Sequence, residues 1–261
     1  MTDISDKLYI STIADDAAET AREYGLGLEI AEFTTAFNMD EDFKTWNDKT
    51  LDNMKGVERF IFHAPFNELC PAAIDPLIAG VAKVRYNQAY DLMTKYGVNT
   101  MIVHSGFMPD LYDEGWFTEK SIGFWKNFLA GKPAGFKLFI ENTFERSPGI
   151  MSRIIRAVRD QRFGMCLDIG HTEATGKGVP LIEWVEQTIP LIRHVHLHNN
   201  YGESDSHNAL CDGNIDVAAA IGAITEAAPD ATFTIEARHA KTSAEWLRAG
   251  GFLQRVGQAN E

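Results

Sequence analysis

The sequence has few cysteines and no long apolar run. Its three cysteines, Cys70, Cys166 and Cys211, are odd in number and widely spaced, so they suggest neither a disulfide framework nor a Cys-x-x-Cys zinc ribbon. A reducing compartment is the expected environment. No apolar stretch approaches the ~18 residues that a membrane-spanning helix needs, and residues 1–7 lack the apolar segment of a secretory signal. We therefore expect a cytoplasmic protein with no membrane partner.

Positive charge is also scarce. The 24 Lys and Arg residues are outnumbered by 37 Asp and Glu residues, which gives a formal net charge of -13. This balance disfavours a dominant basic surface for phosphate backbones. A local basic surface stays compatible with it, and bound divalent cations would offset part of the negative charge. Nucleic acid is therefore a disfavoured partner rather than an excluded one.

Neither a linker nor a repeat divides the chain. No stretch rich in Pro, Gly and Ser marks a boundary, and there is no low-complexity segment or short repeat. The 261 residues, of which 45% are hydrophobic, suffice for a sizeable core. We therefore expect residues 1–261 to form one domain.

Strand-like and helical patterns alternate along the chain. Short apolar or β-branched runs predict strands at 8–13, 26–33, 59–63, 99–104, 137–141, 163–168, 194–198 and 231–236. Helices are predicted at 15–24, 74–96, 118–130, 147–161, 180–188 and 216–228, with a last one starting at Ser243. A polar segment rich in Asp and Lys leads from the second strand to Gly56. This alternation predicts a single (β/α)8 barrel, with a doubly wound open sheet as the alternative.

A histidine-rich segment stands out at 193–216. It contains three histidines on one face of the seventh strand and a carboxylate–imidazole pair in the loop, namely His194, His196, His198, Asp205 and His207. Such an arrangement is typical of a metal site that takes ligands from a strand end and the following loop. The alternative is a buried polar strand whose histidines bond to their neighbours. For His194 and His198 we favour packing or support behind the ligands.

Similar side chains end most of the other strands. Nine candidate metal ligands stand at a strand's end or shortly after it: His63, His104, Glu141, Asp168, His171, His196, Asp205, His207 and Glu236. A barrel brings the C-terminal ends of its strands to one mouth, so these residues would converge there. Each alone has a structural explanation, such as a helix cap at Asp168. Because nine ligands exceed what one ion needs, the sequence predicts one to three divalent ions per chain.

At these residues the chain resembles the xylose isomerase-like TIM barrels, the superfamily that includes endonuclease IV. The motifs that carry the resemblance are His63-Ala-Pro, His104-Ser-Gly, Ile-Glu141-Asn, Leu-Asp168-Ile-Gly-His171, His196-Leu-His-Asn-Asn, Asp205-Ser-His207 and Ile-Glu236-Ala. The resemblance implies Zn, Mn, Mg or Co as the metal. By likeness to endonuclease IV, three ions would be held by His63, His104 and Glu141, by Glu141, Asp168, His196 and Glu236, and by His171, Asp205 and His207.

The same resemblance points to sugar isomerases and epimerases. In these relatives one ion is held by the counterparts of Glu141, Asp168, His196 and Glu236. The two glutamates would stand on opposite sides of the sugar, where one takes a proton as the other returns it. Related sequences often carry the motifs His-Leu-His-Asp-Asn and Gly-x-Gly-x-Ile-Asp. This chain has Asn199 in place of the Asp of the first motif and Cys211 in place of the first Gly of the second, and neither change removes a candidate ligand.

The loops after the third and fourth strands separate these two functions. They are acidic and aromatic and contain no Lys or Arg, whereas a DNA enzyme needs basic and intercalating residues beside its site. An aromatic lid suits a small hydroxylated ligand. The candidate substrate-binding residues are Phe66, Phe107, Trp116, His198 and Arg238, of which Arg238 is the best single candidate for a phosphate contact.

We therefore predict a divalent-metal-dependent isomerase or epimerase that acts on a sugar or sugar phosphate, with Glu141 and Glu236 as the catalytic pair. The alternative is an endonuclease IV-like phosphodiesterase that cleaves abasic sites with a trinuclear zinc site. A third hypothesis is a barrel without catalytic activity that binds metal or belongs to a larger complex. A homo-oligomer is left open.

Overall fold

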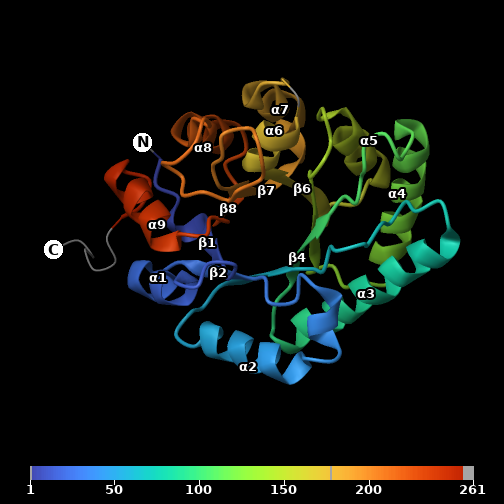
Figure 1. Cartoon of the computed structure of the whole chain (residues 1–261), viewed down its shortest axis with the longest axis horizontal. Coiled ribbons are helices and arrows are strands. Elements are labelled where there is room, and N and C mark those ends of the chain that lie inside the picture. Colours follow the sequence, from blue (N-terminus) through green and yellow to red (C-terminus); the bar gives the residue numbers. More distant parts are fainter. Residues whose placement is uncertain (1, 177, 255–261) are drawn as a thin grey trace.

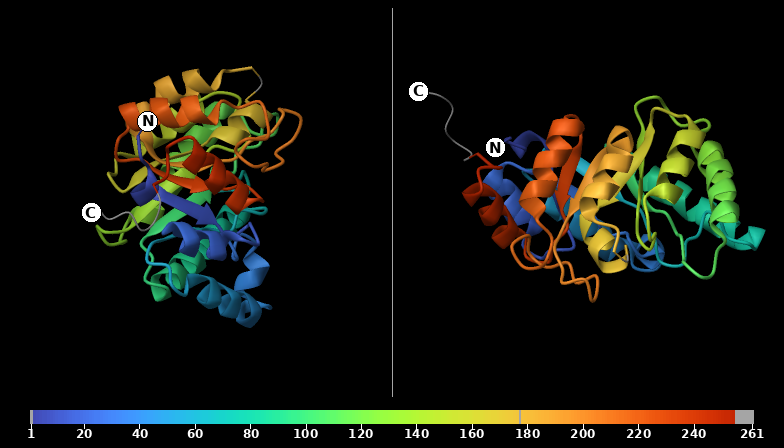
Figure 2. Two further views of the ribbon diagram at one scale, coloured as in Figure 1. Left: turned by 90° about the vertical axis from the view of Figure 1, so that its left-hand side faces the viewer. Right: turned by 90° about the horizontal axis from the view of Figure 1, so that it is seen from above.

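The computed structural model describes residues 2–176 and 178–254. In these residues eight parallel strands close into a barrel in sequence order, with β8 pairing back to β1. Helices surround the barrel (Figure 1), and the two further views show them covering its outer face (Figure 2). This topology confirms the predicted (β/α)8 TIM barrel and excludes the open sheet.

The elements follow the predicted order. The strands are β1 (Leu8–Ser11), β2 (Gly27–Ile30), β3 (Phe60–His63), β4 (Thr100–His104), β5 (Lys137–Glu141), β6 (Phe163–Asp168), β7 (Ile192–Leu197) and β8 (Thr232–Ile235). The α-helices are α1 (Ala17–Tyr24), α2 (Phe43–Met54), α3 (Pro76–Lys95), α4 (Glu114–Leu129), α5 (Gly149–Val158), α6 (Ile169–Thr175), α7 (Leu181–Thr188), α8 (Val217–Ala227) and α9 (Ala240–Ala249). Short 3-10 turns lie at η1 (Ser5–Lys7), η2 (Ala36–Met39) and η3 (Ile189–Leu191).

Two helices were not predicted. The polar segment before Gly56 forms α2, which fully buries only Thr50 and therefore shows little apolar periodicity in the sequence. The second, α6, starts directly after β6, and Asp168 caps it by accepting a hydrogen bond from the His171 backbone N–H at 2.6 Å. The last helix also begins at Ala240 rather than at Ser243. None of the described helices has the length and apolar character to cross a bilayer.

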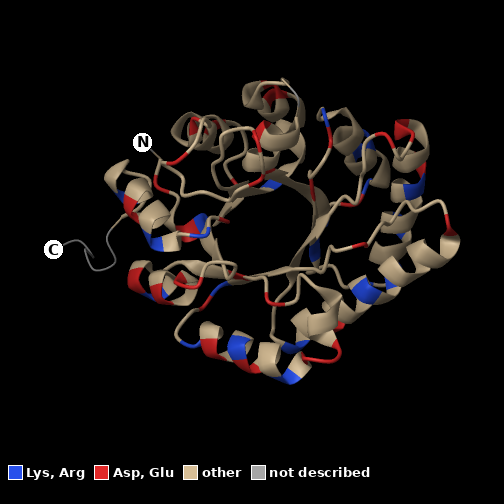
Figure 3. Cartoon of the chain, viewed as in Figure 1, with Lys and Arg blue, Asp and Glu red and all other residues tan. Residues whose placement is uncertain are grey.

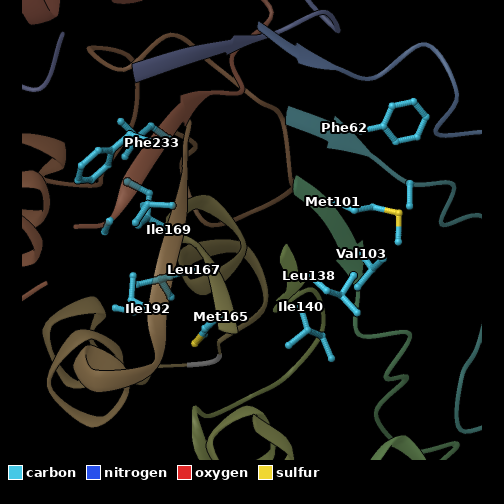
Figure 4. Packing of buried hydrophobic residues seen from close by; sticks show 14 of the residues in the cluster. Phe62, Met101, Val103, Leu138, Ile140, Met165, Leu167, Ile169, Ile192 and Phe233 are labelled. Atoms are coloured by element: carbon cyan, nitrogen blue, oxygen red, sulfur yellow. The ribbon is translucent and has the colours of Figure 1, made fainter. Parts of the chain in front are cut away.

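Side chains on each strand alternate between the helices and the barrel interior. Outward residues such as Val103 and Leu167 belong with Trp125 and Trp184 of the outer helices to one apolar cluster, part of which is shown in Figure 4. The interior of β3–β6 has a second, small cluster made of Ile61, Ile102, Phe139 and Cys166. Two residues further along each of these strands stands a candidate ligand, so the alternation that builds the core also directs the ligands inward.

Side-chain caps define the starts of α3, α4 and α8. Asp113 precedes α4, and its carboxylate accepts a hydrogen bond from the backbone N–H of Trp116 at 2.9 Å. Asp75 and Asp216 cap α3 and α8 in the same way. These caps satisfy N–H groups that have no partner inside the helix.

We expect Asp113→Ala to lower the free energy of unfolding by about 1 kcal/mol, because the cap of α4 is lost. Urea unfolding followed by circular dichroism measures this difference. Glu119→Ala, an exposed position inside the same helix, is the matched control and should change the stability by less than about 0.5 kcal/mol. Equal effects of the two substitutions would contradict a specific capping role.

Candidate metal centre and active site

The structure brings all nine predicted ligands together at the C-terminal mouth of the barrel. His63, His104, Glu141, Asp168 and His196 lie at the ends of β3 to β7. Glu236 directly follows β8, His171 lies on α6, and Asp205 and His207 lie in the loop between β7 and α8, which extends beyond one end of the barrel in the right-hand view of Figure 2. Three of the groups that these residues form have ligand atoms within 4.8 Å of one another: His63, His104 and Glu141; Glu141, Asp168, His196 and Glu236; and His171, His198, Asp205 and His207. The first two groups share Glu141.

Glu141 lies at the centre of these groups. Its Oε2 is 3.3 Å from His63 Nε2, 3.5 Å from His104 Nε2 and 3.5 Å from His196 Nδ1. Its Oε1 is 3.2 Å from His171 Nδ1. Burial by itself raises the pKa of Glu141, but the neighbouring His104 and His196 hold that pKa well below its usual value. The carboxylate is therefore ionised and faces four imidazoles.

The central group combines this carboxylate with two more. His196 Nδ1 lies 2.8 Å from Glu236 Oε2 and 3.7 Å from Asp168 Oδ2. Burial raises the pKa of Asp168, yet His171 and His198 lower it well below the usual value. Among the described residues, the buried atoms without a hydrogen-bond partner include Glu141 Oε1, Glu236 Oε2, Glu29 Oε1 and both ring nitrogens of His196. Converging oxygen and nitrogen atoms that lack partners fit a divalent cation.

Asp205 organises the outer group. Its Oδ2 lies 3.1 Å from both His171 Nε2 and His207 Nε2. Burial lowers the pKa of His207, but the contact with Asp205 outweighs it and raises that pKa to about 9. The pKa of Asp205 is lowered by the same two imidazoles in spite of its burial. These opposite charges hold the loop against α6.

Backbone carbonyls orient three of the histidines. The Nδ1 atoms of His63, His171 and His207 lie 2.9, 2.8 and 2.7 Å from the carbonyl oxygens of Ala64, Asn142 and Glu236. A carbonyl can only accept, so each Nδ1 carries the proton. Each Nε2 then faces a carboxylate of the site, as a ligand nitrogen should.

Sequence reasoning missed Glu29, and it gave His198 two alternative roles, support behind the ligands and substrate contact. Glu29 lies inside the barrel, with Oε1 at 3.2 Å from His196 Nε2. The available signal was an acid in the middle of the apolar run at 26–31. His198 is buried under α6, 3.0 Å from Asp168 Oδ1, which matches the supporting role rather than substrate contact.

A cavity of about 880 Å³ opens above the three groups. Its base includes Glu141 and Glu236, and its walls include the predicted substrate-binding residues Phe66 and Phe107. Arg238 also lines it and is the one Lys or Arg among the described residues that do so. Another hollow, of about 690 Å³, lies between α2 and α3 and contains none of the candidate ligands.

Two predicted substrate-binding residues do not line the cavity, namely His198 and Trp116. Trp116 lies in the first turn of α4, where it is 40% exposed and has the Lys120 ammonium 4.5 Å from its ring centre. Phe66 is the aromatic residue closest to the ligands. It stacks on the His104 ring with the centroids 4.1 Å apart.

A sequence model described as the xylose isomerase-like TIM barrel matches residues 11–253. The chain belongs to this family. An uncharacterized protein of Methanocaldococcus jannaschii, MJ1311, is 24% identical over 189 residues, which are 67% of this chain and 63% of that protein. The chain thus spans less than two thirds of that relative.

Solved structures share the fold of this family member at low identity. A D-tagatose 3-epimerase-like protein is 22% identical with a TM-score of 0.75, covering 93% of this chain and 96% of the other. The TTHB071 protein of Thermus thermophilus, soaked with ZnCl2, is 20% identical with a TM-score of 0.72 and coverages of 98% and 100%. D-psicose 3-epimerase of Clostridium cellulolyticum, with D-tagatose, is 13% identical with a TM-score of 0.71 and coverages of 96% and 100%.

A substitution of Gly170 on α6 tests how closely His198 is packed behind Asp168. A Cβ atom at Gly170 would lie 1.9 Å from His198 Cε1, so Gly170→Ala should displace the imidazole and destabilise the protein by about 1–3 kcal/mol. Gly222→Ala in α8 is the control, because no atom lies within 4 Å of its added Cβ and Ala is the better helix former. Thermal unfolding should show a lower Tm for the first variant alone. A Gly170→Ala protein as stable as the wild type would contradict the close packing.

Proposed function

We propose that the protein is a divalent-metal-dependent isomerase or epimerase of a sugar or sugar phosphate. The observation that carries this proposal is the pair of carboxylates, Glu141 and Glu236, at the base of one cavity and within 4.8 Å of each other in the central group. A reaction that inverts a carbon beside a carbonyl needs one group to remove a proton and another to return it. The fold shared with sugar epimerases supports the proposal.

The central group would hold the catalytic ion. Glu141, Asp168, His196 and Glu236 offer three carboxylates and one imidazole, which suit Mn, Co, Mg or Zn. The chemistry that such an ion supplies when bound is polarisation of the carbonyl and hydroxyl oxygens of the sugar. Asp168, held by His198 and by the start of α6, keeps its place in the group without contacting the cavity.

The cavity walls favour a small hydroxylated ligand over a nucleic acid. Phe66 and Phe107 offer aromatic faces to the apolar side of a sugar ring. Glu68 and Asp205 add negative charge to the lining, and Arg238 is the one described cation there, a position that suits a single phosphate. Figure 3 shows the Lys and Arg residues mainly on the outer helices. A polyanion would therefore meet an acidic mouth.

Glu141→Gln and Glu236→Gln should each lower the turnover of a ketose by about 10²–10⁴-fold, because each removes one proton-transferring group. The assay incubates ketoses such as D-tagatose and D-psicose, and their phosphates, with Mn, Co or Zn in D2O. Chromatography measures the epimer, and NMR measures deuterium at the reacting carbon.

Both readouts should fall together in these variants at saturating metal. Glu173→Gln, an exposed acid on α6, is the control and should retain wild-type rates. Full turnover by either glutamine variant would contradict the paired-glutamate reaction, and wild-type turnover without deuterium uptake would contradict proton transfer with the solvent.

The second candidate is a phosphodiesterase, which the outer group favours. His171, Asp205 and His207 lie together as the third ligand set predicted from endonuclease IV. Their charges at the edge of the cavity could hold a further ion beside the central one, and a set of neighbouring metal ions is suited to phosphate-ester cleavage.

Metal content separates the two candidates. The sugar enzyme should contain about one ion per chain after mild purification, and the phosphodiesterase about three zinc ions. Plasma emission spectrometry provides the count, and a parallel assay uses an oligonucleotide with one abasic site. Three zinc ions together with rapid, chelator-sensitive cleavage would replace our first proposal with the second.

A further inference from the structure

Glu29 is a carboxylate inside the barrel that the proposed reaction does not use. It lies in β2 with its side chain completely shielded from solvent. Its neighbours on the inner face come from strands that do not pair with β2. They are His194 and His196 on β7 and Thr234 on β8. An ionised group in such a place is costly unless each of its oxygens has a partner. The identity of these partners indicates what Glu29 does.

One oxygen of Glu29 is occupied by a network of hydroxyls and an imidazole. The Thr234 hydroxyl donates its only proton to Glu29 Oε2 at 2.7 Å. Thr234 must therefore accept from His194 Nε2, which lies 2.8 Å away. The other nitrogen, His194 Nδ1, lies 2.6 Å from the Thr232 hydroxyl, which can donate to it. The proton order along this network leaves Glu29 Oε1 for another partner.

The charged group beside that oxygen is His196, the imidazole of the central metal group. Glu29 Oε1 lies 3.2 Å from His196 Nε2, an ion-pair contact in which neither atom makes a hydrogen bond. On the opposite edge of the ring, Nδ1 faces Glu236 Oε2 at 2.8 Å and Glu141 Oε2 at 3.5 Å. His196 thus lies between Glu29 on one edge of its ring and the ligand carboxylates of Glu141 and Glu236 on the other edge.

His196 differs from three other histidines of the site in which ring nitrogen points toward the ligand carboxylates. His63, His171 and His207 each place Nδ1 against a backbone carbonyl and direct Nε2 into the site. His196 has the reverse orientation and directs Nδ1 into the site. Glu29 therefore occupies for His196 the place that a carbonyl occupies for the other three.

We propose that Glu29 is a positioning residue of the metal centre, which keeps the proton of His196 on Nε2 and so leaves Nδ1 as the metal-binding nitrogen. The proposal rests on the proposed function only in placing a divalent ion in the central group. A carboxylate behind a ligand imidazole fixes the ring and increases its basicity. Glu29 does this from the second strand, which contributes none of the nine ligands.

Glu29→Gln reverses the contact with almost no change in shape. The Thr234 hydroxyl would continue to donate to the amide oxygen, so the NH2 group would face His196 Nε2 and place donor against donor. His196 would then carry its proton on Nδ1, where the ion binds. The expected result is an affinity for Co²⁺ about 10- to 100-fold lower, the usual effect of losing such a partner.

The affinity is measured by competition with a chromophoric chelator, using the full chain and Co²⁺ alone. The visible absorption of the Co²⁺ complex reports the coordination geometry and should also change. Glu32→Gln is the matched control. Glu32 is an equally buried glutamate just after β2, but it bonds to Thr12 and Asn53 and contacts no ligand. That variant should bind Co²⁺ like the wild type even where its Tm falls.

The amide of Glu29→Gln could fit in the opposite orientation only if Thr234, His194 and Thr232 reversed their protons together. Thr232→Val blocks this reversal, because it removes the acceptor that His194 Nδ1–H would need. Glu29→Gln combined with Thr232→Val should therefore bind Co²⁺ at least 10-fold more weakly than Thr232→Val alone.

Unchanged affinity and absorption in both the single and the combined glutamine variants would overturn the positioning role. An effect of the same size in Glu32→Gln would also overturn it, because the loss would then reflect stability. A wild-type chain that binds no Co²⁺ would contradict the metal centre itself and with it the proposed function. Co²⁺ binding without turnover of any sugar would contradict the proposed reaction and leave the Glu29 result standing.

Discussion

Charge neutralisation inside the barrel is the constraint on which the structure of the site depends. Glu29, Glu141 and Asp168 are all shielded from solvent, and each would raise its pKa and lose its charge in an apolar interior. The imidazoles of His196, His104 and His171, respectively, are the chief groups that hold these three pKa values well below the usual ones instead. The barrel therefore tolerates a charged interior because each of these acids has a histidine nitrogen within 3.5 Å.

The alternation of inward and outward side chains along each strand couples the candidate site to the fold. On β3–β6 the inward residue two positions before each ligand is apolar, as with Ile61 before His63 and Ile102 before His104. A shift of one residue in either strand would turn the ligand outward and an apolar side chain into the site. The strand register that packs the core is thus the one that assembles the candidate metal centre, so the core and the candidate site depend on the same hydrogen-bonded pairing of strands.

The residues of the site that the sequence predicted are those that the barrel topology places by itself. His63, Glu141 and Asp168 end buried runs, and a barrel sends all such ends to one mouth. The parts that were missed depend on contacts across the chain. Glu29 contacts His196 only because the barrel closes and brings β2 and β7 to the same interior. Trp116 does not line the cavity because the first turn of α4 faces solvent. The helix α2 was missed because it buries too little apolar surface to leave a periodic pattern.

The central and outer groups are not independent, because Glu141 and His171 connect them. Glu141 Oε1 lies 3.2 Å from His171 Nδ1, and His171 Nε2 lies 3.1 Å from Asp205 Oδ2. A cation in the central group would draw on the charge of Glu141 and leave His171 with less negative charge around it. Because these contacts join the two groups, a substitution at Glu141 or His171 would affect both of them.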